Sequence, residues 1–213
     1  MSSLEILNSK HAYERVGKAY GIDIKSYHAY NLRFNDINFT GDCERVGQSM
    51  KFCAVEAHHQ NAVVESKNKE ICYGARTILL HAKRKWFTVI STVLWPYAAQ
   101  YLVERHNRLS LDKHTKSPLE KLSGIDDNIS PSDFHTWGCP VYILDSANQG
   151  AISTPKWEPR SHIGIYLGYS PCHADTVALV LNLVTGLVSH QYHVVFDKKS
   201  TVPYLQSSTP PPN

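Results

Sequence analysis

A helix-like stretch near residues 61–82 carries charged and polar side chains at regular spacing. Four of them follow one another at intervals of four, three and four residues: Glu65, Lys69, Cys72 and Arg76. This spacing places them on one line along a helix. A carboxylate followed by cations suits a site for a metal ion and a phosphate backbone. An ordinary surface helix gives the same pattern, because the helix dipole favours an early glutamate and a lysine four residues later forms a surface pair.

A second, apolar line runs along the same predicted helix. Its members fall at helical spacing and are predicted to be buried: Val64, Ile71, Ala75, Ile78, Leu79 and Ala82. The basic sequence Lys83-Arg84-Lys85 follows directly, so the helix is predicted to end in a cluster of cations.

Composition excludes several classes of protein. The 213 residues are 42% hydrophobic with a formal net charge of +3, which is typical neither of a disordered chain nor of a membrane protein. The five cysteines include no C-x-x-C pair and follow no signal peptide, so we expect free thiols in a reducing compartment, the nucleus or cytoplasm, and no secretion. The most apolar run, Val89 to Leu102, is too short to span a bilayer, so no membrane partner is expected.

The elements that must position the helix come before it. A capping box at Ser2-Ser3-Leu4-Glu5 predicts a first helix, whose buried stripe is predicted to be Ala12, Val16, Ala19 and Tyr20. A strand is predicted over residues 22–30, a short helix over 36–46 closed by Gly47, and a buried strand over 50–55. This alternation is an α/β order and favours parallel pairing of the two strands.

The character of the chain changes after the long helix. A second helical pattern runs from Phe87 to Leu109 with a kink expected near Pro96, and Ser117-Pro118 starts a short helix that ends before Gly124. After a polar linker over 125–136, β-branched and aromatic runs predict strands over 140–144, 161–169, 177–183 and 187–196, with a tight turn at Thr185-Gly186. Such short strands predict a small β-barrel. Its core is predicted to include Trp137, Trp157, Tyr166 and Phe196.

Several motifs in this order carry a resemblance to a known family. The string FCAVEAHHQNAVVESKNKEICYGARTILLHAKRKW resembles the end of the catalytic core of copia-type retrotransposon integrases. The later strings WGCPVYILD, PRSHIGIYLGYSP, VALVLNLVTGLVS and HVVFD resemble the small barrel that follows this core. The resemblance extends from about His11 to Asp197, nearly the whole chain.

The resemblance implies a fold class and a domain plan. We expect an α/β structure plus a small β-barrel, that is, a truncated ribonuclease H-like core followed by an SH3-like barrel. The core with its trailing helices is expected over residues 1–124, the linker over 125–136, the barrel over 137–198 and a disordered tail over 199–213.

The resemblance also implies a chemistry that this chain lacks in part. Integrase cores use three carboxylates to hold two Mg²⁺ or Mn²⁺ ions, which activate the attacking oxygen and stabilise the leaving one. Glu65 matches the family's glutamate, but Tyr30 stands where the family has its second aspartate. The first aspartate would lie upstream of the first helix, and the chain begins at Met1. We therefore expect a catalytically inactive relative of these enzymes, with weak or no metal binding at Glu65 and no cofactor.

Nucleic-acid binding is the part of the family's function that we expect to persist. Lys69 matches a position at which the family contacts DNA, and Gln60 and Asn61 match a polar pair before the helix. Arg76 continues the line of Lys69, and three further cations are expected to contact phosphates: Lys83, Arg84 and Lys85. The alternative is a solvated helix face.

Three functions remain open from the sequence. The first is an inactive integrase-like remnant of a retrotransposon that binds DNA weakly and without sequence preference. The second is a non-catalytic module whose barrel binds protein or chromatin. The third is an integrase subunit that an intact integrase completes in trans. Because the chain begins after the expected first strands, self-association through an open sheet edge is also expected.

Overall fold

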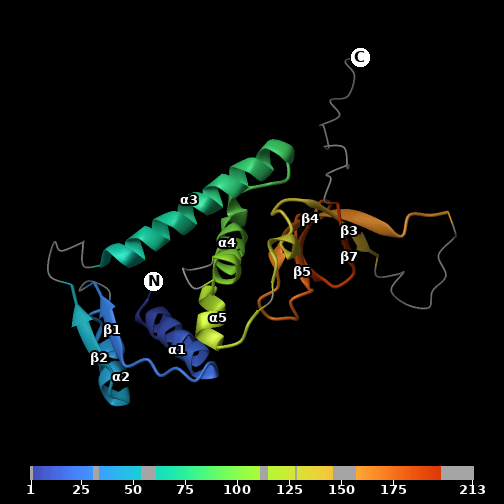
Figure 1. The fold of residues 1–213 in the computed structure, drawn as a ribbon. Coiled ribbons are helices and arrows are strands. Elements are labelled where there is room, and N and C mark those ends of the chain that lie inside the picture. Colours follow the sequence, from blue (N-terminus) through green and yellow to red (C-terminus); the bar gives the residue numbers. More distant parts are fainter. Residues whose placement is uncertain are drawn as a thin grey trace, which may run out of the picture. The chain divides into compact units, whose positions relative to one another are not determined.

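The chain forms two compact units. The computed structural model describes residues 2–30, 34–53, 61–110, 115–127, 129–145 and 157–197. One unit is Met1–Lys69 and the other is Glu70–Asn213, so the division falls inside the long helix α3 (Ala62–Lys85). Figure 1 labels the elements of both units. Among the described residues, no helix is long and apolar enough to cross a membrane.

The N-terminal unit, Met1–Lys69, alternates helices and strands before the first turns of α3. Its elements are α1 (Ser3–Ala19), β1 (Ser26–Ala29), α2 (Ile37–Val46) and β2 (Ser49–Phe52). The two strands pair in parallel, with Tyr27 opposite Met50 and Ala29 opposite Phe52. The predicted α/β order and parallel pairing are confirmed, although both strands are shorter than predicted.

The helices of this unit begin where the sequence predicts. The Ser2 side chain accepts a hydrogen bond from the Glu5 amide, and the Glu5 side chain accepts one from the Ser2 amide, which completes the capping box of α1. Asp36 caps α2, and Gly47 ends it in the left-handed conformation at a φ of 77°, where a side chain would be strained.

The buried face of α1 differs from the predicted one. Ile6, Lys10 and Gly17 are buried, whereas Val16 and Tyr20 are exposed. The reason is that α1 packs its polar Lys10 inward, where ion pairs with Glu14 of the same helix and Asp42 of α2 satisfy the ammonium group. The apolar core beside it is small, with Ile6, Phe39 and Cys43 packed against Tyr27 and Met50.

The C-terminal unit, Glu70–Asn213, joins helices to a five-stranded antiparallel sheet. Its helical elements after α3 are η2 (Thr92–Leu94), α4 (Trp95–Leu109), α5 (Pro118–Ser123) and η3 (Pro131–Asp133). Pro96 lies in the first turn of α4 and starts this helix, rather than kinking a longer one as predicted. A proline lacks the amide hydrogen that a helix interior needs, but a first turn leaves that donor unpaired anyway.

The strands of the C-terminal unit follow the predicted runs closely. They are β3 (Pro140–Leu144), β4 (Ser161–Tyr169), β5 (Ala178–Asn182), β6 (Val188–Gln191) and β7 (Val194–Phe196). Their spatial order is β6-β5-β4-β3-β7, all antiparallel, and the last predicted strand is divided into β6 and β7. A strongly curved sheet of this kind is consistent with the predicted SH3-like barrel (Figure 1).

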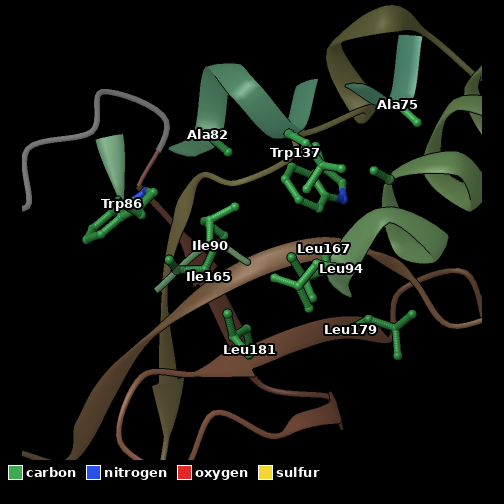
Figure 2. Packing of buried hydrophobic residues seen from close by; sticks show 12 residues of the cluster. Ala75, Ala82, Trp86, Ile90, Leu94, Trp137, Ile165, Leu167, Leu179 and Leu181 are labelled. Atoms are coloured by element: carbon green, nitrogen blue, oxygen red, sulfur yellow. The ribbon is translucent and has the colours of Figure 1, made fainter. Parts of the chain in front are cut away.

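The core of the C-terminal unit lies between its helices and the sheet. Figure 2 shows Trp137 between α3, which carries Ala75 and Ala82, and the sheet that carries Leu167. Of the apolar line of α3, Ala75, Leu79 and Ala82 are buried and Ile71 and Ile78 are half-buried. Val64 is exposed, which corrects the prediction for the first turn. Trp157 is 93% exposed, so its predicted place in the barrel core is wrong. Trp137 and Tyr166 are buried as predicted.

The predicted domain plan stays a prediction. The predicted linker over residues 125–136 contains η3, whose Ser130 side chain accepts a hydrogen bond from the Ser132 amide. The predicted tail over residues 199–213 lies outside the described residues.

Candidate functional site

The candidate site lies in the N-terminal unit, where β1 ends and α3 begins. Strand β1 ends at Ala29, so Tyr30 directly follows its carboxyl end. Helix α3 begins at Ala62 and carries Glu65 in its first turn, where the positive end of the helix dipole favours a carboxylate. In parallel α/β structures, functional groups gather at this edge of the sheet. Tyr30 and Glu65 are thus both placed at the carboxyl end of β1, next to the first turn of α3.

Tyr30 and Glu65 contact one another directly. The Tyr30 hydroxyl donates a hydrogen bond to Oε1 of Glu65. Tyr30 therefore faces the first turn of α3, which carries Glu65. The hydrogen bond to Glu65 raises the pKa of Tyr30 to about 12, because removing the proton would set a phenolate against a carboxylate. Near neutral pH, Tyr30 is therefore a neutral donor and not a second anion.

Tyr30 and Glu65 by themselves do not supply the oxygens that a pair of divalent cations needs. Mg²⁺ prefers several anionic or neutral oxygens in an octahedron, and two such ions need several carboxylates between them. Here one oxygen of Glu65 already accepts the Tyr30 hydroxyl. Within the described ranges, no group of three or more His, Cys, Asp or Glu side chains could hold a metal ion. Asp36 is occupied as the cap of α2, where it accepts hydrogen bonds from the Asn38 and Phe39 amides.

The predicted nucleic-acid contacts fall mostly on the surface of α3. Lys69 is exposed in the N-terminal unit, and Asn61 there is buried, which leaves little of its side chain available to a ligand. Gln60 lies outside the described residues. In the C-terminal unit, Arg76, Lys83 and Arg84 are exposed, and Lys85 is half-buried. The last turn of α3 thus presents cations to solvent, and their role in binding stays a prediction.

The structure also holds a buried ionic network that sequence reasoning missed. The Lys10 side chain is fully buried, with its Nζ 2.7 Å from Asp42 Oδ2 and 2.8 Å from Glu14 Oε1. Tyr27 and Gln48 donate further hydrogen bonds to Glu14 at 2.8 and 2.6 Å. Lys10 and Glu14 are four residues apart on α1, a spacing that also occurs in ordinary surface pairs. Nothing in the sequence marked the contact with Asp42, 32 residues away.

The charges of this network stabilise one another. Hydrogen bonds from Lys10 and then Arg45 hold the pKa of Asp42 well below its ordinary value. Burial alone would lower the pKa of Lys10, but its hydrogen bonds to Asp42 and Glu14 raise it. Burial and the hydrogen bond to Glu14 raise the pKa of Tyr27. Each group therefore keeps its ordinary charge near neutral pH, and the network connects α1 to α2 and to β1.

Comparison with known proteins finds a family match for the C-terminal part of the chain. Residues 139–210 match the family described as "Retroviral polymerase SH3-like domain", a range that includes β3 to β7. The match supports a retroelement origin for this part of the chain. No curated protein matches the chain.

One similar solved structure is described as "CryoEM structure of simian T-cell lymphotropic virus intasome in complex with PP2A regulatory subunit B56 gamma". The likeness has a TM-score of 0.43 with 14% sequence identity, and it covers 90% of this chain and 61% of that chain. The chain therefore spans about three-fifths of the length of that structure's chain.

Proposed function

We propose that the chain is an integrase-like part of a copia-type retrotransposon that binds DNA without sequence preference and does not itself catalyse strand transfer. In this proposal the N-terminal unit derives from a ribonuclease H-like core. The family match over residues 139–210 supports the retroelement origin. The motifs quoted from residues 52–86 support the copia-type core.

The hydrogen bond between Tyr30 and Glu65 is the observation that carries the lack of catalysis. Strand transfer through two metal ions needs anionic oxygens on both sides of the ions. Tyr30 offers a neutral hydroxyl, whose pKa of about 12 keeps it protonated in the cell. The hydroxyl also donates its hydrogen bond to one of the two Glu65 oxygens, so the pair does not form a strong binding site for a cation.

The DNA-binding part of the proposal depends on the cations at the end of α3. Lys83 and Arg84 are exposed, so their charged groups can approach a phosphate backbone. Each phosphate contact releases a counterion, which makes binding fall as the salt concentration rises.

A salt titration tests this binding. The full chain is titrated against a short fluorescein-labelled duplex DNA between ~50 and ~200 mM NaCl. Replacing Lys83 and Arg84 together by glutamine is expected to weaken binding and reduce the slope of log K against log salt by about 2. The control variant replaces Lys18 and Lys25 by glutamine, because it removes the same charge from exposed positions elsewhere. Equal slopes for both variants would overturn the assignment of this surface.

A strand-transfer assay tests the lack of catalysis separately. The full chain is incubated with a retroelement-end duplex and with either Mg²⁺ or Mn²⁺, and no joined product is expected. Joining by the wild-type protein that disappears in Glu65→Ala would contradict the proposal.

A further inference from the structure

A groove in the C-terminal unit combines aromatic rings with carboxylates. Its volume is 610 Å³. Its lining comes from α4, the segment around η3, the end of β4 with the residues that follow it, and β7 with the residue Tyr192 before it. This size is within the range of pockets that enclose organic ligands. The groove is separate from the Tyr30–Glu65 pair, which belongs to the N-terminal unit.

Aromatic side chains form one part of the groove. The lining rings are Phe134, His135, Tyr169, Tyr192 and Phe196. The His135 and Phe196 rings stack with centroids 3.4 Å apart and an interplanar angle of 16°. The Tyr169 hydroxyl donates to the Asp133 carbonyl oxygen at 3.2 Å, which fixes that ring. Tyr192 is 62% exposed, so a large part of its ring is open to a ligand.

Acidic side chains form another part of the groove. Glu104, Asp133 and Asp175 line it together with a single guanidinium, that of Arg108. Arg108 is already bound by Glu104 and Asp175, and outside the lining also by Asp127 at 3.3 Å. Three lining carboxylates against one guanidinium leave a formal excess of two negative charges. The Asp175 side chain is 76% exposed, so its charge reaches the groove entrance.

We propose that this groove binds an extended segment of a protein partner through a lysine or arginine side chain. The faces of aromatic rings attract cations, and the attraction strengthens where water is partly excluded. The surrounding carboxylates add attraction for the same charge and repel acidic segments and the phosphates of DNA. The groove extends across several elements and holds more than a single ammonium group, so the flanking backbone of a peptide fits beside the cation.

A peptide-binding measurement tests this proposal on the full chain. The probe is a fluorescein-labelled peptide of alternating alanine and arginine, and its binding is followed by fluorescence anisotropy without DNA present. Saturable binding is expected. Tyr192→Ala and Asp175→Asn are each expected to weaken it ~5-fold, the size of a typical exposed cation–π or charge contact.

Two matched variants serve as controls. Tyr73→Ala removes a tyrosine of nearly equal exposure, 65%, that lies on α3 outside the groove lining. Asp126→Asn removes a carboxylate that is 75% exposed and also outside the lining. Both controls are expected to bind within ~2-fold of the wild-type protein. Circular dichroism verifies that each variant is folded. If Tyr192→Ala is unfolded, the binding of Asp175→Asn alone decides the outcome.

Several results would overturn the proposal. Equal weakening by the groove and control variants would show that the peptide binds by overall charge. Equal binding of a peptide with glutamate in place of arginine would contradict the charge argument. Competition by free arginine as strong as that by the unlabelled peptide would show a site for a small amine and not for a protein segment.

Discussion

The Tyr30 hydroxyl and the Glu65 carboxylate depend on one another for their protonation states. Because the hydrogen bond to Glu65 raises the pKa of Tyr30 to about 12, replacing that carboxylate should reverse the shift. We expect Glu65→Gln to lower the pKa of Tyr30 towards ~10, since an amide is uncharged and a weaker acceptor. Carbon NMR on protein labelled at tyrosine Cζ measures this value, and Tyr30→Phe identifies the signal. An unchanged pKa in Glu65→Gln would show that the two groups are apart in solution.

The sign of this shift also sets a pH window for stability. A folded-state pKa above the unfolded one means that the contribution is fully present below ~10 and is lost as the pH rises through about 12. The contribution is thus constant across the physiological range, and the hydrogen bond is not a pH switch there.

The buried pair of Lys10 and Asp42 makes a stronger prediction about stability. Asp42→Asn leaves the Lys10 ammonium buried with a weaker partner, which we expect to lower the free energy of unfolding of the N-terminal unit by about 3 kcal/mol. Since the pKa of Asp42 is lowered in the fold, its contribution is present above the unfolded value of ~3.9 and is lost as the pH falls below it. The difference in free energy of unfolding between the wild-type protein and Asp42→Asn should therefore become smaller as the pH falls below ~3.9.

Urea unfolding followed by far-ultraviolet circular dichroism measures this difference. Asp23→Asn is the control, because Asp23 is an exposed residue of the same unit. If Asp42→Asn lowers the free energy of unfolding by as much near pH ~3 as near neutral pH, packing and not charge is responsible for the effect.

At the scale of elements, Gly164 in β4 lies where a side chain has no room. A Cβ at Gly164 would lie 2.8 Å from Ile143 Cδ1, 3.1 Å from the Leu181 carbonyl oxygen and closer still to Val180 Cγ1. The side chains of Val180 and Ile143 would have to shift, so we expect Gly164→Ala to destabilise the C-terminal unit by about 2 kcal/mol. Tryptophan fluorescence during urea unfolding measures this, with Ser161→Ala at the exposed start of the same strand as control. Equal stability of the two variants would refute the packing argument.

The elements whose ends carry helix-capping or turn residues could be predicted from the sequence. The Ser117 capping box and the left-handed Gly124 enclose α5 as predicted, and Gly186 turns between β5 and β6 at a φ of 69°. These signals are local, because a cap or turn involves residues only a few positions apart. Burial depends on distant partners instead. Periodicity placed Val16 inside and gave no reason to bury Lys10, whose partner Asp42 comes from another helix.

The two sites also differ in how far the sequence predicts them. In the motif match, Tyr30 and Glu65 stand at two positions of one site, and in the structure a hydrogen bond joins them. The role of the pair stays a prediction. The aromatic and acidic groove gave no sequence signal, because its lining is spread between Glu104 and Phe196 and is assembled only by packing of the C-terminal unit.

At the scale of the whole molecule, the two units differ in how much core they bury. Among the described residues, the N-terminal unit has one cluster of three buried core residues, Ile6, Phe39 and Cys43, beside a two-stranded sheet. The C-terminal unit buries a cluster of twelve residues and a second cluster of six. Since each buried apolar side chain contributes about 1.5–3 kcal/mol, the N-terminal unit should open first. The predicted self-association through its sheet edge stays a prediction.

Hydrogen exchange on dilute protein tests this order of opening at matched amides. The Cys53 amide donates to the Ala29 carbonyl oxygen across β1 and β2 at 3.0 Å, and the Tyr166 amide donates to the Cys139 carbonyl oxygen at the same distance. The two hydrogen bonds are alike in length, so a difference in protection reports the stability of the surrounding unit. We expect the Cys53 amide to exchange at least ~10-fold faster than that of Tyr166, which corresponds to about 1.4 kcal/mol. Equal protection of both amides in a proven monomer would show that the two units unfold together and that the small core does not limit the first.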